Sequence, residues 1–332
     1  MSDTHQDVYI PAEWTPHEAL WTAWPSHPGM WKDEFEGARR EVAAMVAELS
    51  AGDVVRVLAR GDEAVASATR ALAGRAEVIA ADFGDIWLRD TGPIFALADG
   101  KLIALRFANN GWGGKYVLPG DDRVGDTVAL AAGATIARCG FVLEGGALEH
   151  DGAGSVLTTR QCLLNPNRNA GWSQVLAEGK LREALHCKRL LWLDRGLLND
   201  HTDGHVDNLA RFVAPNTVVC QSASGGDDPN AALYDTIAEE LRAMDLTVQR
   251  IPSPGKIQNA VGEVMPASHM NFIIGNEAVV VPVYNEQYGG EAVRALQNLI
   301  TDRRVVGVAS NHLLTGGGSF HCITQQQPAC AN

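Results

Sequence analysis

Near its C-terminus the chain reads GGGSFHCITQQ, over residues 316–326. Three consecutive glycines remove side chains from the backbone where another group must approach closely. Cys322 follows at the start of an alternating apolar and polar pattern, which is typical of a short strand. The stretch indicates either a nucleophilic thiol or a small buried hydrophobic residue, since many intracellular cysteines are of the second kind. A partner elsewhere in the chain has to decide between these readings.

The composition is that of a soluble globular protein. The chain has 332 residues, 46% of them hydrophobic, and a formal net charge of -13, which argues against nucleic acid as a partner and is compatible with a cationic substrate. Solubility is the simplest reason for this acidity. The N-terminal residues contain no signal-like apolar run and no window has membrane length, so we expect no membrane segment and a cytoplasmic protein. The six cysteines show no zinc-ligand spacing, which predicts reduced thiols and no metal.

A repeating order of strand, turn, strand, helix and strand begins after residue 90. Asp-Gly, Pro-Asn and Gly-Asn pairs separate the first two strands of each copy, as in hairpins. The pattern predicts, for example, a helix near 126–136 and a strand at 141–143 in the first copy. The four copies are expected over residues 93–143, 147–193, 206–251 and 269–308.

A fifth copy can be completed only by joining the two ends of the chain. It would pair a strand around 320–324 with a strand at 19–24 and take its helix and last strand from residues 33–59. This predicts a single α/β domain over residues 1–332, built as a five-unit pseudo-symmetric propeller that leaves few exposed sheet edges. A doubly wound parallel sheet would lack the hairpins.

Each unit carries one polar residue where its first strand begins. These residues are Asp90, Glu144, His205, Asn271 and Cys322. Taken singly, they are explained by a helix cap, a surface carboxylate, a core histidine, a turn and a buried thiol. If the five units surround an axis, however, the five side chains converge there, and together they make a reactive site.

The motifs that contain these residues resemble those of a known family. DTGP at 90–93, LEGG at 143–146, DGHVDN at 203–208 and the stretch at 316–326 occur in the same order in agmatine deiminases and related bacterial peptidylarginine-deiminase-like proteins, and IPAEWTPHE at 10–18 matches them too. The resemblance implies the pentein fold and a guanidine-modifying enzyme that uses a cysteine and no metal or organic cofactor. A homodimer is also an expectation from the family.

The resemblance assigns a role to each residue. Asp90 and Asp207 would hold a planar guanidinium through paired hydrogen bonds, and the spacing of His205 and Asp207 predicts that both lie on one face of a strand. Cys322 would attack the central carbon, His205 would act as acid and then base, and Glu144 would orient the imidazole. The products would be a ureido compound and ammonia, formed through a thiouronium intermediate.

Agmatine, converted to N-carbamoylputrescine, is the leading substrate. The family has an acidic residue where this chain has His201, so we expect Asp203 to help to hold the amine. Trp112, in a glycine-rich loop, would cover the alkyl chain, although an ordinary surface loop explains the same sequence. Arg168 and Lys115 are candidates for pairing with the carboxylate of free arginine.

Several alternatives stay open at the level of sequence. The substrate could be arginine or peptidyl-arginine, and an amidinotransferase would use the same intermediate with an amine in place of water. A non-catalytic pentein binding module has no need of the cysteine, histidine and paired acids. A cysteine protease would leave Asp90 and Asp207 unexplained.

Overall fold

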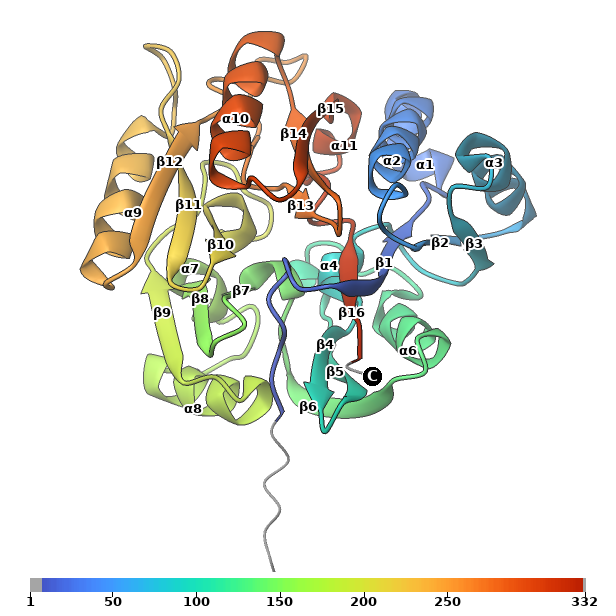
Figure 1. Ribbon diagram of the computed structural model, residues 1–332, viewed down its shortest axis with the longest axis horizontal. Coiled ribbons are helices and arrows are strands. Elements are labelled where there is room, and N and C mark those ends of the chain that lie inside the picture. Colours follow the sequence, from blue (N-terminus) through green and yellow to red (C-terminus); the bar gives the residue numbers. More distant parts are fainter. Residues whose placement is uncertain (1–7, 331–332) are drawn as a thin grey trace, which may run out of the picture.

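The computed structural model describes residues 8–330 and contains five sheets arranged around a centre (Figure 1). Four sheets have three strands and one has four. In each three-stranded sheet the first two strands are antiparallel, while the second and third are parallel and joined through a helix. The predicted five-unit α/β propeller is therefore confirmed.

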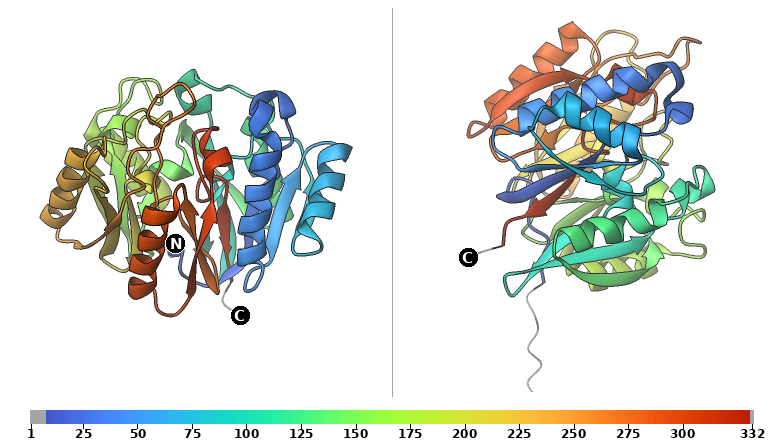
Figure 2. Two further views of the ribbon diagram at one scale, coloured as in Figure 1. Left: turned by 90° about the horizontal axis from the view of Figure 1, so that it is seen from above. Right: turned by 90° about the vertical axis from the view of Figure 1, so that its right-hand side faces the viewer.

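The four consecutive units follow the predicted order, with the helices on the outer side of the ring (Figure 2). The first unit consists of β4 (Ile94–Ala98), β5 (Lys101–Ala108), α6 (Asp121–Ala131) and β6 (Thr135–Val142), and the second of β7 (Glu149–His150), β8 (Ser155–Thr159), α8 (Gln174–Leu185) and β9 (Arg189–Leu193). The third consists of β10 (Ala210–Ala214), β11 (Thr217–Ser222), α9 (Ala231–Ala243) and β12 (Thr247–Pro252). The fourth consists of β13 (Ile273–Ile274), β14 (Ala278–Val283), α10 (Glu286–Leu299) and β15 (Arg304–Ala309).

The fifth unit is closed by the two ends of the chain, as the sequence predicts. Strand β1 (His17–Ala23) lies antiparallel to β16 (Gln325–Pro328) and parallel to β2 (Val55–Ala59). Helix α2 (Phe35–Leu49) joins β1 to β2, and α3 (Asp62–Leu72) leads to a fourth strand, β3 (Glu77–Ala80). The indole nitrogen of Trp21 donates to the Gln327 side chain at 3.0 Å, so a side chain contact also crosses this closure.

Several predicted elements differ from the structure. The strand predicted at 141–143 overlaps only the end of β6, which covers 135–142. Residues 320–324 form turns instead of a strand, because the Thr324 hydroxyl donates to the Phe320 carbonyl at 2.8 Å and the strand begins only at Gln325. Helix α6 covers 121–131 instead of 126–136, since Gly133, at φ 69°, reverses the chain into β6.

The outer helices pack their apolar sides onto the sheets. In α9 the buried residues Tyr234, Ile237, Ala238 and Leu241 recur at intervals of three and four, as one helix face requires. The inner ends of the units carry buried polar and charged residues instead, so the axis is where the fold brings chemical groups together. Within residues 8–330, no helix has the length and apolar character that crossing a bilayer requires.

Trp21 offers a test of the closure. We expect Trp21→Ala to lower the free energy of unfolding by about 3–5 kcal/mol, because it leaves a cavity under β1. Trp21→Phe keeps most of the ring and loses one hydrogen bond, which corresponds to about 1 kcal/mol. Urea unfolding followed by circular dichroism measures both. The exposed control Val261→Ala should change the value by less than about 0.5 kcal/mol; equal effects of all three variants would contradict this account.

Candidate active site

One segment from the inner end of each unit contributes to the site. Asp90 lies on the short helix α4 (Leu88–Thr91), Glu144 precedes the 3₁₀ turn η2 (Gly145–Ala147), and Asn271 precedes β13. His205 precedes η3 (Val206–Asn208), and Cys322 lies in the turns between α11 (Asn311–Leu314) and β16. All five side chains are buried, and the contacts described below bring them together.

The predicted strand that would carry both His205 and Asp207 is absent. Val206–Asn208 is a 3₁₀ turn, and the strand β10 starts at Ala210. The two side chains nevertheless meet beside Gly146, where a Cβ atom would lie 2.7 Å from His205 Nδ1 and 3.1 Å from Asp207 Oδ2. Position 146 therefore has to be glycine, because the His205 and Asp207 side chains leave no room for a Cβ atom.

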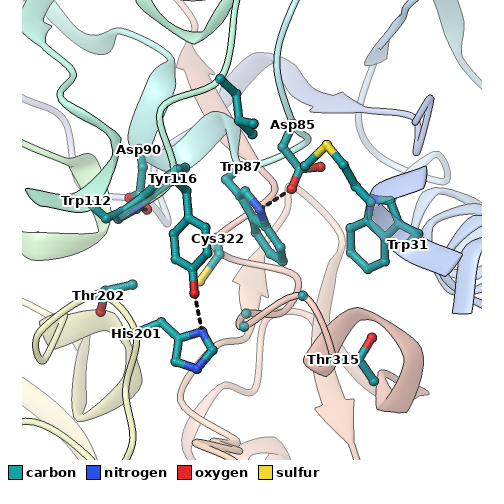
Figure 3. Close-up of a pocket in the computed structure, with 15 residues that line it drawn as sticks. Trp31, Asp85, Trp87, Asp90, Trp112, Tyr116, His201, Thr202, Thr315 and Cys322 are labelled. Atoms are coloured by element: carbon teal, nitrogen blue, oxygen red, sulfur yellow. Dashed lines mark hydrogen bonds between the residues drawn. The ribbon is translucent and has the colours of Figure 1, made fainter. Parts of the chain in front are cut away.

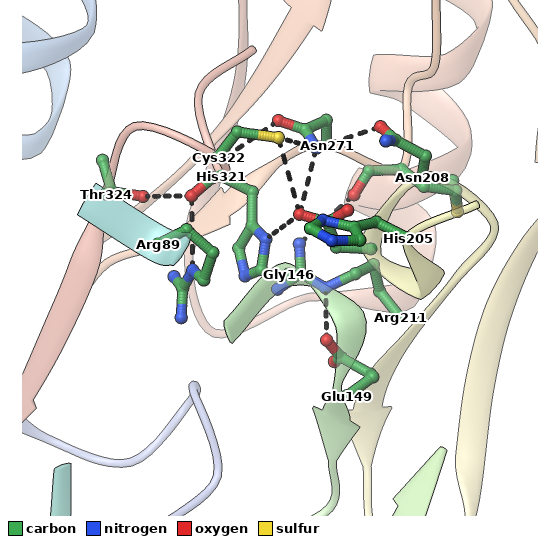
Figure 4. A network of polar contacts seen from close by, with 12 residues as sticks. Arg89, Gly146, Glu149, His205, Asn208, Arg211, Asn271, His321, Cys322 and Thr324 are labelled. Atoms are coloured by element: carbon green, nitrogen blue, oxygen red, sulfur yellow. Dashed lines mark hydrogen bonds and ion pairs between the residues drawn. The ribbon is translucent and has the colours of Figure 1, made fainter. Parts of the chain in front are cut away.

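Cys322 is held by an amide side chain. Asn271 Nδ2 donates to the sulfur at 3.0 Å, and the Cys322 backbone N–H donates to Asn271 Oδ1 at 3.2 Å (Figure 4). The thiol faces Asp207 Oδ2 at 3.6 Å. A Cβ atom on Gly318 would lie 2.7 Å from the Trp87 ring and 3.1 Å from the sulfur, which explains why this part of the glycine run has no side chain.

The electrostatic surroundings keep Cys322 protonated. Burial raises the pKa of the thiol well above its ordinary value, and the Asp207 and Asp90 carboxylates act in the same direction. A cation placed between the sulfur and these acids would have the opposite effect on the pKa. The arrangement therefore favours a thiolate only when a positive charge is bound.

The two acids beside the sulfur are oriented differently. Asp90 Oδ1 accepts from the Gly146 backbone N–H at 2.9 Å and its Oδ2 accepts from the Trp112 indole at 2.8 Å. Asp207 Oδ2 contacts His321 Nδ1 at 2.8 Å, whereas Asp207 Oδ1 is buried and has no hydrogen-bond partner in the described part of the chain. Burial raises the pKa of Asp90; for Asp207 the effect of burial is outweighed by His321, His205 and Arg211 together, which lower the pKa.

His205 lies between two carboxylates. Its Nδ1 is 3.7 Å from Asp90 Oδ2 and its Nε2 is 3.8 Å from Glu144 Oε2, which are ion-pair distances longer than hydrogen bonds. Burial opposes the charged imidazolium, but the Asp90 and Glu144 carboxylates outweigh it and raise the pKa of His205 well above its ordinary value. The imidazole can therefore hold a proton at neutral pH and deliver it inside the site.

Arg168 binds Glu144, the acid that faces Nε2 of His205. Its Nε donates to Glu144 Oε1 at 2.7 Å, and its Nη1 donates to Asp203 Oδ2 at 2.7 Å. Lys115 binds the other oxygen of Asp203 at 2.6 Å. Burial opposes ionisation of Glu144, but the nearby His205 and Arg168 lower the pKa of its carboxyl group.

These ion pairs bear on three expectations. Arg168 and Lys115 do not present free cations to a substrate carboxylate, because both are paired with acids of the protein. Asp203 is not among the pocket-lining residues, and its oxygens accept hydrogen bonds from Lys115, Arg168 and Asn167. The expected contact between Asp203 and the substrate amine stays a prediction.

A pocket of about 410 Å³ leads to Asp90 and Cys322 (Figure 3). His205 and Asp207, which are fully buried, lie beneath its lining. Apart from these groups the walls are mainly aromatic and apolar, and no Lys or Arg is among the described residues that form them. The lining residues are Met30, Trp31, Asp85, Trp87, Asp90, Trp112, Tyr116, Leu118, His201, Thr202, Thr315, the three glycines 316–318 and Cys322.

The loop that contains Trp112 forms one wall of this pocket. Trp112 is buried and adopts a left-handed conformation, with φ 52° and ψ 50°, inside the short helix α5 (Gly111–Gly114). Tyr116, which follows it, contacts His201 Nδ1 through its hydroxyl at 3.2 Å. His201 thus lies in the pocket wall, and Trp112 contacts Asp90 in addition to lining the pocket.

One cluster of metal-ligating residue types occurs among the described residues. Glu144, Cys162 and His205 each offer a ligand atom within 4.8 Å of the others, and all three are buried. The Arg168 guanidinium already binds Glu144 here, and it would repel a metal ion. The chemistry of this set is that of an acid–base group and its partners.

The sequence did not predict the contacts of three residues at the site. Asn271 was recognised as an axis residue but not as a ligand of the cysteine sulfur, and His321 was not recognised at all. Asp85, which lines the pocket and accepts from the Trp87 indole at 2.7 Å, was also missed. The position of Asn271 at the entry of a first strand was the one available signal.

Residues 9–328 match the family of Porphyromonas-type peptidyl-arginine deiminases. The agmatine deiminase of Stutzerimonas stutzeri is 36% identical over 360 aligned positions, which cover 99% of this chain and 98% of that protein. The chain belongs to this family. The resemblance found in the sequence motifs is thereby confirmed, as is the expected class of enzyme, a hydrolase of the agmatine deiminase type.

Solved structures of agmatine deiminases have the same fold. The Enterococcus faecalis enzyme has a TM-score of 0.92 at 29% identity, with 98% of this chain and 96% of that chain covered. A cysteine-to-serine variant of the C. jejuni agmatine deiminase with substrate bound has a TM-score of 0.93 at 26% identity, with 100% and 99% covered.

The raised pKa of Cys322 predicts how this family member reacts with iodoacetamide. Alkylation of Cys322, followed by mass spectrometry of its peptide in a Cys330→Ser background, should accelerate with rising pH to above pH 9, because the thiolate is the reactive form. A rate that reaches its plateau below pH 8 would show instead that the free protein already holds a thiolate.

Proposed function

We propose that the protein hydrolyses a guanidino group, with agmatine as substrate and N-carbamoylputrescine and ammonia as products. The observation that carries this proposal is the pair of buried acids next to the Cys322 sulfur. Asp207 Oδ1 lacks a hydrogen-bond partner within residues 8–330, no Lys or Arg there pairs with Asp90 or Asp207, and buried polar atoms are seldom left unpaired. A planar cation with several N–H donors supplies what these acceptors need.

Recognition of the guanidinium would use Asp90 and Asp207. Two carboxylates along its edges accept paired hydrogen bonds and fix its plane relative to the sulfur. Because Asp207 lies beneath the pocket lining, the guanidinium has to pass Asp90 and reach the pocket floor. Its positive charge there lowers the pKa of Cys322, so substrate binding itself releases the thiol proton.

Two half-reactions would follow. The Cys322 thiolate adds to the guanidinium carbon, and the His205 imidazolium protonates one amino group, which leaves as ammonia; the thiouronium stays on the sulfur. His205, now neutral, takes a proton from water as the resulting hydroxide adds to the same carbon. The carbon–sulfur bond then breaks, the ureido product forms, and the hydroxyl proton returns to the sulfur. Glu144, held by Arg168, stabilises the charged imidazole in both steps.

The pocket walls favour an amine tail over an amino acid. Asp85 is the second carboxylate among the lining residues, and burial raises its pKa, so an ammonium group beside it would restore its ionised form. Aromatic and apolar walls between the two acids suit an alkyl chain. An arginine carboxylate would find no Lys or Arg among the described lining residues, which supports agmatine over arginine and peptidyl-arginine.

The first test is the release of ammonia from agmatine, arginine and an arginyl peptide, with no acceptor amine present. We expect agmatine to give the highest kcat/KM, and we expect Cys322→Ala and Cys322→Ser to reduce turnover at least 10⁴-fold because the covalent route is lost. Thermal unfolding of the two variants serves as the folding control. Turnover of the variants near the level of the unchanged protein would refute the role of Cys322, and a requirement for an acceptor amine would favour an amidinotransferase.

Asp85 offers a separate test of the tail. We expect Asp85→Asn to raise KM for agmatine by about 10- to 100-fold, which is the typical effect of a lost charge-assisted contact. Butylguanidine, which has the same chain without the amine, is the matched control, and its kcat/KM should change by less than about threefold. Equal losses for both substrates would show that Asp85 supports the pocket without binding the amine.

A further inference from the structure

His321 directly precedes Cys322, but its ring lies behind the site. It is fully buried, and its Nδ1 is 2.8 Å from Asp207 Oδ2 (Figure 4). Its Nε2 is 3.1 Å from Glu13 Oε2. No step of the reaction proposed above uses this histidine. It is a buried titratable group with one carboxylate at each nitrogen.

The protonation of this cluster decides which contact is a hydrogen bond. An ionised carboxylate only accepts, and a neutral imidazole donates from one nitrogen and accepts at the other. Burial and the nearby Arg211 and Arg89 lower the pKa of His321, and the pKa values of Glu13 and Asp207 are lowered as well. The cluster therefore favours two ionised carboxylates and a neutral ring, which donates from one nitrogen only.

The charged groups around the cluster favour donation toward Asp207. Arg211 binds Glu13 through Nη2 and Glu149 through Nε, and Arg89 Nη2 lies 3.9 Å from Glu13. Glu13 therefore lies next to the positive charge of two arginines. Asp207 Oδ2 has no arginine within salt-bridge distance in the described structure, and its other close contacts are the Asn271 amide at 3.3 Å and the Cys322 thiol at 3.6 Å.

We propose that His321 is a positioning residue that donates from Nδ1 to Asp207 Oδ2 and so turns Asp207 Oδ1 toward the substrate guanidinium. The part of this inference that concerns the substrate rests on the proposed function. The Nδ1–H bond keeps Asp207 ionised although it is buried beside a thiol. It also fixes the carboxylate plane, because Oδ2 is engaged while Oδ1 has no partner among residues 8–330.

Three substitutions separate this role from a merely structural one. In His321→Asn the amide Nδ2 takes the place of the ring Nδ1, whereas in His321→Gln the amide nitrogen reaches the place of Nε2; His321→Leu removes both donors. We expect His321→Asn to keep kcat/KM for agmatine within about fivefold. His321→Gln and His321→Leu should lose about 10- to 100-fold, the usual effect of a lost hydrogen bond to a charged group.

Stability serves as the internal control, because His321→Asn and His321→Gln each lose one of the two contacts. Their melting temperatures should therefore fall by similar amounts while their kcat/KM values diverge. Equal kcat/KM values for these two variants, or values that simply follow the melting temperatures, would overturn the proposal.

Nitrogen-15 NMR of histidine-labelled protein tests the hydrogen bond without any substrate. The His321 signal, assigned by its loss in His321→Asn, should show a protonated Nδ1 between pH 6 and pH 8. A bare Nδ1 in that range would refute the donation to Asp207. Because this readout needs no turnover, it separates failure of the proposed histidine role from failure of the proposed deiminase activity, which ammonia release reports.

Discussion

The structure depends on the concentration of buried negative charge at the axis of the ring. Charge buried in a protein is costly unless it is paired, and most of the axis acids have a partner within the protein. Arg168 binds Glu144, while Arg211 binds both Glu13 and Glu149. Asp90 and Asp207 differ from these acids, because no Lys or Arg pairs with either of them in the described chain. The site is therefore complementary to a positive charge in addition to that of the His205 imidazolium, which lies 3.7 Å from Asp90.

The ring explains how such a site is assembled from distant parts of the sequence. In each unit the site residue lies just before the inner strand begins, so one short segment per unit contributes a side chain without distorting a sheet. Cys322 depends on the closure in particular, since it lies in the turns that lead into β16, and β16 is held by β1 from the other end of the chain. Loss of that pairing would disturb the sulfur as well as the fold. The backbone N–H of Arg89 donates to the Cys322 carbonyl at 3.0 Å, and this hydrogen bond also joins one unit to another.

The sequence predicts the repeat because turn pairs such as Asp99-Gly100 and Pro215-Asn216 mark each hairpin. In the structure Asp99 and Asn216 adopt the left-handed backbone conformations that such turns need. It mispredicts residues 320–324 because their alternation of apolar and polar residues imitates a strand, whereas hydroxyl bonds of Thr324 stabilise turns. Convergence of His205 and Asp207 is predicted correctly, although a 3₁₀ turn brings it about instead of a strand.

The remaining contacts could not be predicted from sequence because they join residues that no local pattern relates. His321 meets Glu13 across a separation of 308 residues, and Arg168 meets Asp203 across 35. Both contacts depend on the relative placement of whole units. An acidic residue such as Asp203 looks the same in the sequence whether it faces a substrate or a buried arginine. Only the positions of the partners distinguish the two cases.

The loop around Trp112 connects Asp90 with the pocket wall at His201. Its tryptophan keeps a left-handed backbone that costs a non-glycine residue about 1 kcal/mol or more. Three contacts offset that cost: the indole bond to Asp90, the Lys115 ion pair with Asp203 and the Tyr116 contact with His201. The first contact orients an acid of the site, and the third joins two residues of the pocket wall. Any movement of this loop therefore changes the orientation of Asp90 and the shape of the pocket wall at the same time.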